Sequence, residues 1–259
     1  MKKSLLFLCL FITFISCKKD KEFSFEEKVY QKILLESCIE DDCTEVKINT
    51  AEIIDPVNDI TTKINQNNLV IINDILSFDE NPHDVSSYDE IVSSFINSFT
   101  EMAKKFPKDS FPWKGTTQNT VTFYNNHLLS FAIEYYTFTG GAHGYKGEKA
   151  VHYNPLTGEQ YNNQELFKDW EGFSKLLESK LREQRGIDKE DNINSHGLLF
   201  DEDVFKMPEN IFFYEESVIA YYNSYDITAF SDEPVRITFS KEEIEPFLNF
   251  LLIPNKSNK

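Results

Sequence analysis

The sequence is poor in positive charge. Its 259 residues include 26 Lys and Arg against 43 Asp and Glu, which gives a net charge of −17. Nucleic-acid binding needs the opposite field, because Lys and Arg make most of the contacts to phosphate. We therefore expect no nucleic-acid partner. The same negative charge favours solubility and attracts cationic partners.

Sequence patterns that mark catalytic and cofactor sites are also missing. There is no Gly-x-Ser-x-Gly elbow, no His-Glu-x-x-His and no glycine-rich phosphate loop. Residues 188–192 begin like a calcium loop, but Ile193 replaces the required glycine and Leu199 replaces the bidentate acid. Eight residues separate the candidate metal ligands His143 and His152, which is only weak evidence for a metal. We expect no cofactor, no metal and no catalytic residue.

No apolar run is long enough to span a membrane as a helix, which takes roughly 20 residues. The longest run, residues 5–15, is interrupted only by Thr13 and follows Lys2 and Lys3. A basic start and a short apolar segment are typical of a cleaved export signal. Residues 14–17, Phe-Ile-Ser-Cys, resemble a bacterial lipobox, although leucine is more usual than phenylalanine at the first position.

The lipobox resemblance implies that residues 1–16 are a lipoprotein signal peptide and that Cys17 carries lipid. Acyl chains together with the polar run 18–27 would tether the chain within residues 17–30. The expected location is the bacterial cell envelope, on the periplasmic or cell-surface side of a membrane. The alternative is an ordinary secretory peptide with an incidental cysteine. Removing residues 1–16 removes two lysines and no acid, which shifts the net charge to −19.

Two cysteines remain after the export signal and the lipidated residue, because Cys9 leaves with the signal. Cys38 and Cys43 lie between two strand-like runs, and disulfides persist in an oxidising compartment. We expect a structural disulfide that closes a tight turn. The spacing is not Cys-x-x-Cys, which weakens the alternative of a redox pair.

Periodicity predicts the secondary structure. Apolar residues at helical spacing predict a helix within residues 57–78 and another around residues 173–181. A further helix begins at Ser87, with Glu90 completing a capping box, and ends at Pro107. A last helix follows Ser240, although Pro246 lies inside its pattern. The predicted strands are residues 29–35, 44–50, 120–124, 128–138, 149–153, 211–214, 218–222 and 235–239.

These elements form sequential hairpins and helices without β-α-β alternation. That order predicts an α+β fold with antiparallel sheets and packed helices. We expect two sub-regions that form one compact ectodomain.

The most distinctive stretch is residues 135–144, Tyr-Tyr-Thr-Phe-Thr-Gly-Gly-Ala-His-Gly. An aromatic strand here runs into glycines, which permit left-handed backbone angles and close approach. We assign Tyr136, Gly140, Gly141 and His143 as candidate ligand-binding residues, with the glycines shaping the backbone. The alternative for the histidine is a buried turn residue that hydrogen-bonds the backbone.

A resemblance to a known family rests on several motifs in combination. They are Tyr-x-x-x-Gly-Gly-Ala-His at 136–143, Asn-x-x-Thr-Gly at 154–158, Leu166-Phe167, Phe212-Phe213, the strand 218–222, Tyr225-Asp226-Ile227 and the strand 235–239. Together they resemble the extracytoplasmic module of the lysozyme-sensing anti-sigma factor RsiV and the non-catalytic region of PdaC-type peptidoglycan deacetylases. The likeness covers most of residues 31–252.

The resemblance implies a PdaC-like α+β region at 31–149, an RsiV-like α+β region at 150–259 and a non-catalytic role at the envelope. It implies lysozyme as a ligand, which the acidic charge suits. We expect neither deacetylase nor anti-sigma activity, because no deacetylase domain follows Leu252 and no transmembrane or cytoplasmic segment is present.

Three functions stay open. The first is a lipid-anchored binding or sensor domain for lysozyme, another basic protein or peptidoglycan. The second is a structural or assembly lipoprotein of the envelope. The third is an envelope-glycan hydrolase using carboxylates that the sequence does not identify. Tyr221, Tyr222 and Tyr225 could stack on sugar rings, but strand aromatics of this kind are more typical of a core.

Overall fold

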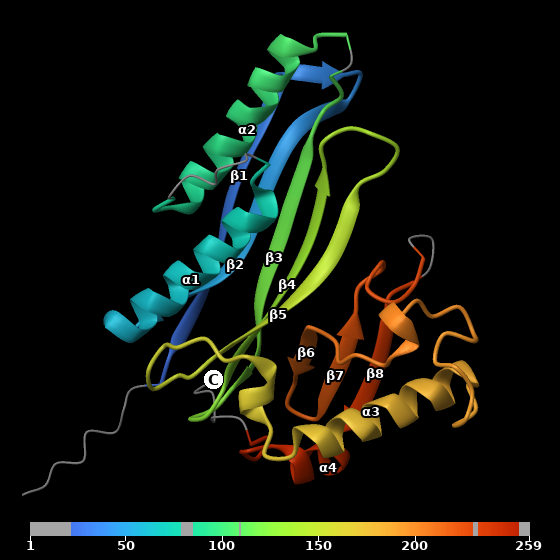
Figure 1. Cartoon of the computed structure of the whole chain (residues 1–259). Helices are drawn as coiled ribbons and strands as arrows, with labels where there is room; N and C mark the ends of the chain where they lie inside the picture. The colour runs from blue at the N-terminus through green and yellow to red at the C-terminus, as the bar shows by residue number, and fades with distance from the viewer. Residues whose placement is uncertain (1–21, 79–84, 109, 230–232, 254–259) are drawn as a thin grey trace, which may run out of the picture.

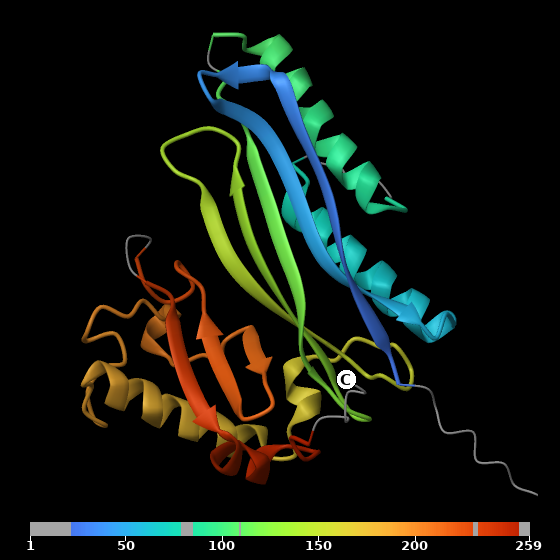
Figure 2. The ribbon, with the colours of Figure 1, turned by 180° about the vertical axis from the view of Figure 1, so that it is seen from behind.

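The computed structural model describes residues 22–78, 85–108, 110–229 and 233–253. Both the expected signal peptide and Cys17 lie outside these ranges. Among the described residues, no helix has the length and apolar character needed to cross a membrane. The structure has two lobes, each with its own sheet (Figures 1 and 2).

The first lobe is a long, twisted five-stranded sheet in the order β1-β2-β3-β4-β5. Two helices cover one of its faces, as Figure 1 shows. The elements are β1 (Ser24–Ile39), β2 (Asp42–Asp55), α1 (Asp59–Leu76), α2 (Tyr88–Lys105), β3 (Lys114–Tyr124), β4 (Leu129–Phe138) and β5 (Tyr145–Tyr153). A disulfide between Cys38 and Cys43 closes the β1–β2 turn, which confirms the expected pairing.

The predicted α+β fold with antiparallel sheets and packed helices is confirmed, with one pair of strands as an exception. β2 and β3 run parallel, whereas every other named pair is antiparallel. The reason lies in the connection between them: α1 and α2 carry the chain back along the sheet before β3 begins. Parallel neighbours require a crossover of this kind.

The helices and sheet of the first lobe enclose its hydrophobic core. α1 contributes Ile64, Ile72 and Leu76, spaced so that they share one face. α2 adds Phe95 against Gly115 of β3, where a Cβ atom would lie 2.8 Å from the Phe95 ring. Glycine at that position therefore lets the helix pack closely on the sheet.

Caps fix the ends of these helices. Asn58 and Thr61 cap α1 reciprocally. At α2, the Ser87 side chain accepts from the backbone N–H of Glu90, as predicted. The Glu90 carboxylate instead accepts from the backbone N–H of Ser86 at 2.7 Å, one residue before the expected partner.

The second lobe is a three-stranded antiparallel sheet packed on α3. Its elements are α3 (Trp170–Arg185), β6 (Asn210–Phe213), β7 (Ser217–Tyr222), β8 (Val235–Ser240) and α4 (Lys241–Ile244). Phe173 of α3 is fully buried against Phe167 and Phe239, with ring centroids 4.5 and 5.2 Å apart. Aromatic side chains thus make up much of this core.

The C-terminal helix is shorter than predicted. Ser240 and Glu243 form the expected capping box, but α4 ends at Ile244. A 3-10 turn, η3 (Glu245–Phe247), follows, with Pro246 in its first positions. Proline lacks the N–H that a longer helix would need there. Two further 3-10 turns are η1 (Asn163–Leu166) and η2 (Asp201–Asp203).

Two of the predicted domain boundaries differ from those in the structure. The predicted tether 17–30 is too long, because β1 begins at Ser24 and pairs with β2 from there. The predicted division between residues 149 and 150 passes through β5, a strand of the first sheet. The second lobe begins after that strand, so the α+β class holds while the border shifts.

The second lobe closes the open edge of β5. Asn210 accepts from the backbone N–H of Ala150 at 2.9 Å, and Asn223 pairs with both the N–H and the C=O of Glu148 at 2.7 and 3.1 Å. Two asparagine side chains thus satisfy backbone groups that an edge strand would leave exposed. The contact orients the lobes at the base of the β4–β5 hairpin.

Candidate functional site

The loop between β4 and β5 projects from the end of the first sheet, above the second lobe (Figures 1 and 2). Gly140 and Gly141 lie in it with φ of +103° and +95°. Side-chain-bearing residues adopt such angles only with strain. This confirms the predicted conformational role of both glycines; their role in binding stays a prediction.

Tyr136 and His143 each lie beside Gly144, near the tip of the hairpin. Tyr136 is 38% exposed, and its ring lies across Gly144, where a Cβ atom would meet the hydroxyl oxygen at 2.3 Å. His143 directly precedes Gly144 in the chain and is exposed. Its Nδ1 lies 3.1 Å from the Gly144 carbonyl oxygen. The alternative of a buried turn histidine is therefore wrong about burial, although the backbone contact is present.

Tyr135 lies on the opposite face of the hairpin, because neighbouring strand residues alternate. Its ring crosses Gly147, its partner on β5, where a Cβ atom would lie 2.4 Å from the hydroxyl oxygen. Burial raises the pKa of the Tyr135 hydroxyl, and Tyr145 and Asp226 raise it further. The group therefore stays protonated and acts as a hydrogen-bonding hydroxyl.

Three tyrosines form a row from β4 to the second lobe. The Tyr135 and Tyr145 ring centroids are 6.0 Å apart, and Tyr145 stacks on Tyr225 at 5.8 Å. Tyr145 is 41% exposed and Tyr225 is 45% exposed. Tyr225 also has a φ of +82°, rare for a residue with a side chain. We call Tyr135, Tyr145 and Tyr225 the tyrosine row.

Sequence reasoning missed most of this row. Tyr221 and Tyr222 are buried, as the core interpretation predicts, but Tyr225 lies in the following loop and is exposed. The available signal was a pair of glycines three residues apart, Gly144 and Gly147, which leaves room for two tyrosine rings from β4. Only the strand register shows which tyrosine crosses which glycine.

A pocket of about 320 Å³ adjoins the row on the helix-bearing face of the sheet. It lies between α1 and the β4–β5 hairpin. Its lining includes apolar, aromatic and charged side chains. The lining residues are Ile71, Asp74, Ile75, Tyr135, Thr137, Tyr145 and Lys149.

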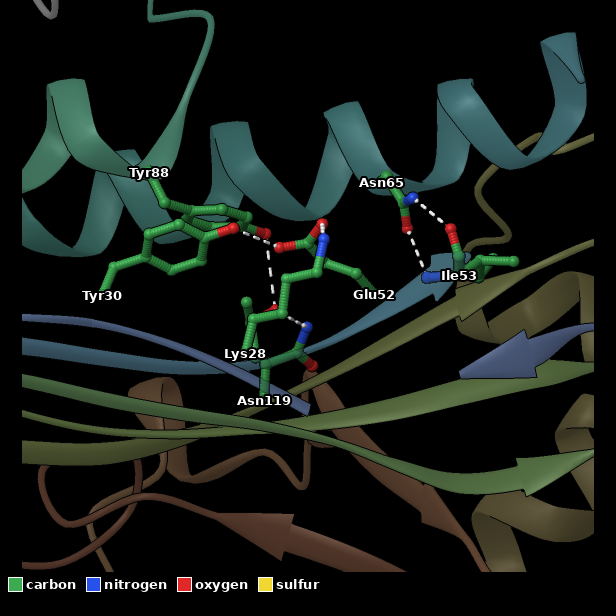
Figure 3. Close-up of polar contacts among 8 residues, drawn as sticks. Lys28, Tyr30, Glu52, Ile53, Asn65, Tyr88 and Asn119 are labelled. Carbon is green, nitrogen blue, oxygen red and sulfur yellow. Dashed lines mark hydrogen bonds and ion pairs between the residues drawn. The ribbon is translucent and has the colours of Figure 1, made fainter. Parts of the chain in front are cut away.

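Figure 3 shows another group of polar side chains, which lies between the helices and the sheet of the first lobe. Glu52 accepts from the Tyr30 hydroxyl at 2.8 Å and pairs with Lys28 at 3.0 Å. Tyr30 stacks on Tyr88 of α2 with centroids 5.0 Å apart. Burial raises the pKa of Tyr88 to about 12, so this hydroxyl does not ionise at neutral pH.

The rest of the cluster in Figure 3 also joins helices to strands. Thr50 contacts the Tyr88 hydroxyl at 3.4 Å and accepts from Asn119 at 3.2 Å. Asn65 of α1 bonds both backbone groups of Ile53 at 2.9 and 3.0 Å. These mutually paired groups fix α1 and α2 on the sheet, which favours a structural role over a catalytic one.

The two histidines considered as metal ligands do not share a site. His143 is at the exposed hairpin tip, whereas His152 is 2% exposed and contacts Ser130 Oγ at 3.0 Å. In the described part of the chain, no group of three or more His, Cys, Asp or Glu residues is arranged to hold a metal.

Comparisons with known proteins support the fold. A family model described as deacetylase PdaC matches residues 37–146. No protein of curated function matches the sequence significantly. A solved DUF3298 family structure from Bacteroides fragilis NCTC 9343 is 18% identical, with a TM-score of 0.68 over 88% of this chain and 94% of that one.

A DUF3298 family protein from Pseudomonas aeruginosa PAO1 is 17% identical, with a TM-score of 0.63 over 92% of this chain and 99% of that one. At such identities the likeness shows the fold. The matched segment runs from the end of β1 to the start of β5 and includes the hairpin tip. Residues 37–146 are therefore similar to the PdaC family model, and the chain as a whole has the fold of the DUF3298 structures.

Proposed function

We propose that the chain is a non-catalytic binding domain, held at the bacterial envelope by lipid on Cys17, which binds a basic protein such as lysozyme. The observation that carries this proposal is the exposed hairpin tip, where Tyr136 and His143 each lie beside Gly144 and two neighbouring glycines adopt positive φ angles. Tyrosine is enriched among residues that dominate protein interfaces.

Charge supports the choice of partner. The chain carries a net charge of −17, so a basic protein approaches it faster through electrostatic steering. The tyrosine supplies desolvated contact area, and the histidine supplies a polar contact within the same surface. Steering sets the association rate, while these close contacts set how long the complex lasts.

The two rival functions rest on weaker observations. A structural lipoprotein needs no exposed tip with left-handed glycines. A glycan hydrolase needs a carboxylate pair in a cleft, and the pocket contains a single carboxylate, that of Asp74. The word deacetylase in the name of the family model describes that family and does not identify a reacting group in this chain.

Binding of lysozyme to residues 18–259 tests the proposal. All described core residues lie between Phe23 and Leu252, so this chain keeps both cores. We expect saturable binding at physiological salt that exceeds binding of an unrelated basic protein. Tyr136→Ala should weaken it about tenfold, equivalent to about 1.4 kcal/mol, and His143→Ala should weaken it less.

Phe106→Ala is the matched control, because Phe106 is an exposed aromatic residue next to α2 and 54% exposed. It should leave the affinity unchanged. Equal binding by both basic proteins, falling alike with salt, would reduce the interaction to charge. Undiminished affinity in Tyr136→Ala would remove the hairpin tip from the binding surface.

A further inference from the structure

The pocket beside α1 opens on the face of the β4–β5 hairpin opposite to Tyr136. α1 contributes Ile71 and Ile75 to one wall, and β4 and β5 contribute Tyr135 and Tyr145 to the other. Its volume of about 320 Å³ falls within the range of small-molecule sites. It is therefore a second surface, separate from the proposed protein-binding tip.

Two opposite charges face this pocket from different elements. Asp74 comes from α1 and Lys149 comes from β5. Across the residues that the structure describes, neither side chain forms an ion pair or a hydrogen bond. By contrast, Glu148, the neighbour of Lys149, is paired with Arg236.

Apart from Thr137, the other residues that line the pocket are apolar or aromatic. The Tyr135 side chain can lie across Gly147 of β5 because this glycine has no side chain that would displace it. Tyr145 is braced in turn by stacking on Tyr225. Gly147 and Tyr225 thus help to position the aromatic wall of the pocket, which Thr137 also lines.

This arrangement selects among ligand classes. A lipid tail would cover Asp74 and Lys149 without pairing them, which is unfavourable. A polyanion would be repelled by the net charge of −17. A neutral sugar would leave both charges without a counter-ion. A molecule with an ammonium group, a carboxylate and an apolar body can pair with both Asp74 and Lys149. Its apolar part can pack against the apolar and aromatic residues of the pocket.

We propose that this pocket binds a small zwitterion of the amino-acid or short-peptide class, with Asp74 facing its ammonium group and Lys149 facing its carboxylate. Ile71, Ile75 and Tyr145 take its apolar side chain. The pocket and the hairpin tip share the β4–β5 hairpin but present different faces. This proposal therefore stands or falls independently of lysozyme binding.

The test uses the dipeptide alanyl-phenylalanine, its N-acetyl derivative and its C-terminal amide as probes. Binding is followed by the NMR signals of the Ile71 and Ile75 methyl groups. We expect saturable shifts with the dipeptide. Each blocked derivative should bind about fivefold more weakly, because exposed ion pairs contribute up to about 1 kcal/mol.

Two variants assign the charges. Asp74→Asn should bind the free and N-acetyl dipeptides equally, and Lys149→Gln should bind the free and amidated dipeptides equally. Glu101→Gln and Lys104→Gln, at exposed positions on α2, are charge-matched controls that should keep the full discrimination. All four positions are exposed, so folding is not at risk.

The absence of saturable methyl shifts at millimolar dipeptide would overturn the proposal. Equal binding of the free and blocked dipeptides by the unaltered protein would also overturn it, since the charges would then play no part. So would binding of N-acetylglucosamine oligomers in place of the dipeptide, which would mark a sugar site. Loss of lysozyme binding alone would leave the proposal intact.

Discussion

Replacing Phe212 with alanine is expected to lower the free energy of unfolding by about 3–5 kcal/mol. Phe212 is fully buried on β6, where it packs against Ala132 of β4 and the ring of Tyr221 at 5.7 Å. It therefore joins the second lobe to the first sheet. Its loss removes apolar contact and leaves a cavity that the two rigid sheets cannot fill.

Urea denaturation followed by tryptophan fluorescence measures this effect. The two tryptophans report on different lobes, because Trp113 lies in the first core and Trp170 packs against the second. Phe106→Ala, at an exposed position, should change the free energy of unfolding by less than about 0.5 kcal/mol. If Phe212→Ala lowers the free energy of unfolding no more than Phe106→Ala does, the stability of the lobes does not depend on the contact made by Phe212.

Acidification is expected to destabilise the protein through His152. Burial between the lobes lowers the pKa of this side chain from 6.5 to about 4. The unfolded chain therefore takes up a proton at a higher pH than the folded chain does. The stability contribution is full above pH 6.5 and is lost as pH falls towards 4, a change of about 3 kcal/mol.

Urea denaturation at several pH values between 7.5 and 4 tests this expectation. In His152→Gln the free energy of unfolding should fall less steeply between pH 6.5 and 4. The reduction in slope should correspond to the uptake of one proton fewer on unfolding, because no imidazole remains at this position. His143→Gln is the matched control and should keep the slope of the unaltered protein, since His143 is exposed. An unchanged slope in His152→Gln would assign the acid sensitivity to carboxylates instead.

The sequence predicts local structure better than it predicts the relation between distant strands. Helix α1, helix α2 and the hairpin strands follow from apolar spacing and from caps such as Ser87, which act within a few residues. The parallel pairing of β2 with β3 depends on where two helices return the chain. No local pattern contains that information.

The candidate site divides in the same way. Gly140, Gly141 and His143 stand out in the sequence because they lie within four consecutive residues, and the structure therefore places them in the same loop. The tyrosine row depends on the register that sets Tyr135 opposite Gly147 and on a lobe contact that brings Tyr225 to Tyr145. The Asp74–Lys149 pocket likewise depends on the packing of α1 over β5.

Hydrogen exchange of residues 18–259 with and without lysozyme tests the proposed binding surface most directly. Our account predicts slower exchange concentrated at residues 136–146, at the hairpin tip, with little change in α2 or α3. Protection centred on other elements, or none at lysozyme concentrations that saturate binding, would contradict the assignment of the hairpin as the ligand-binding surface.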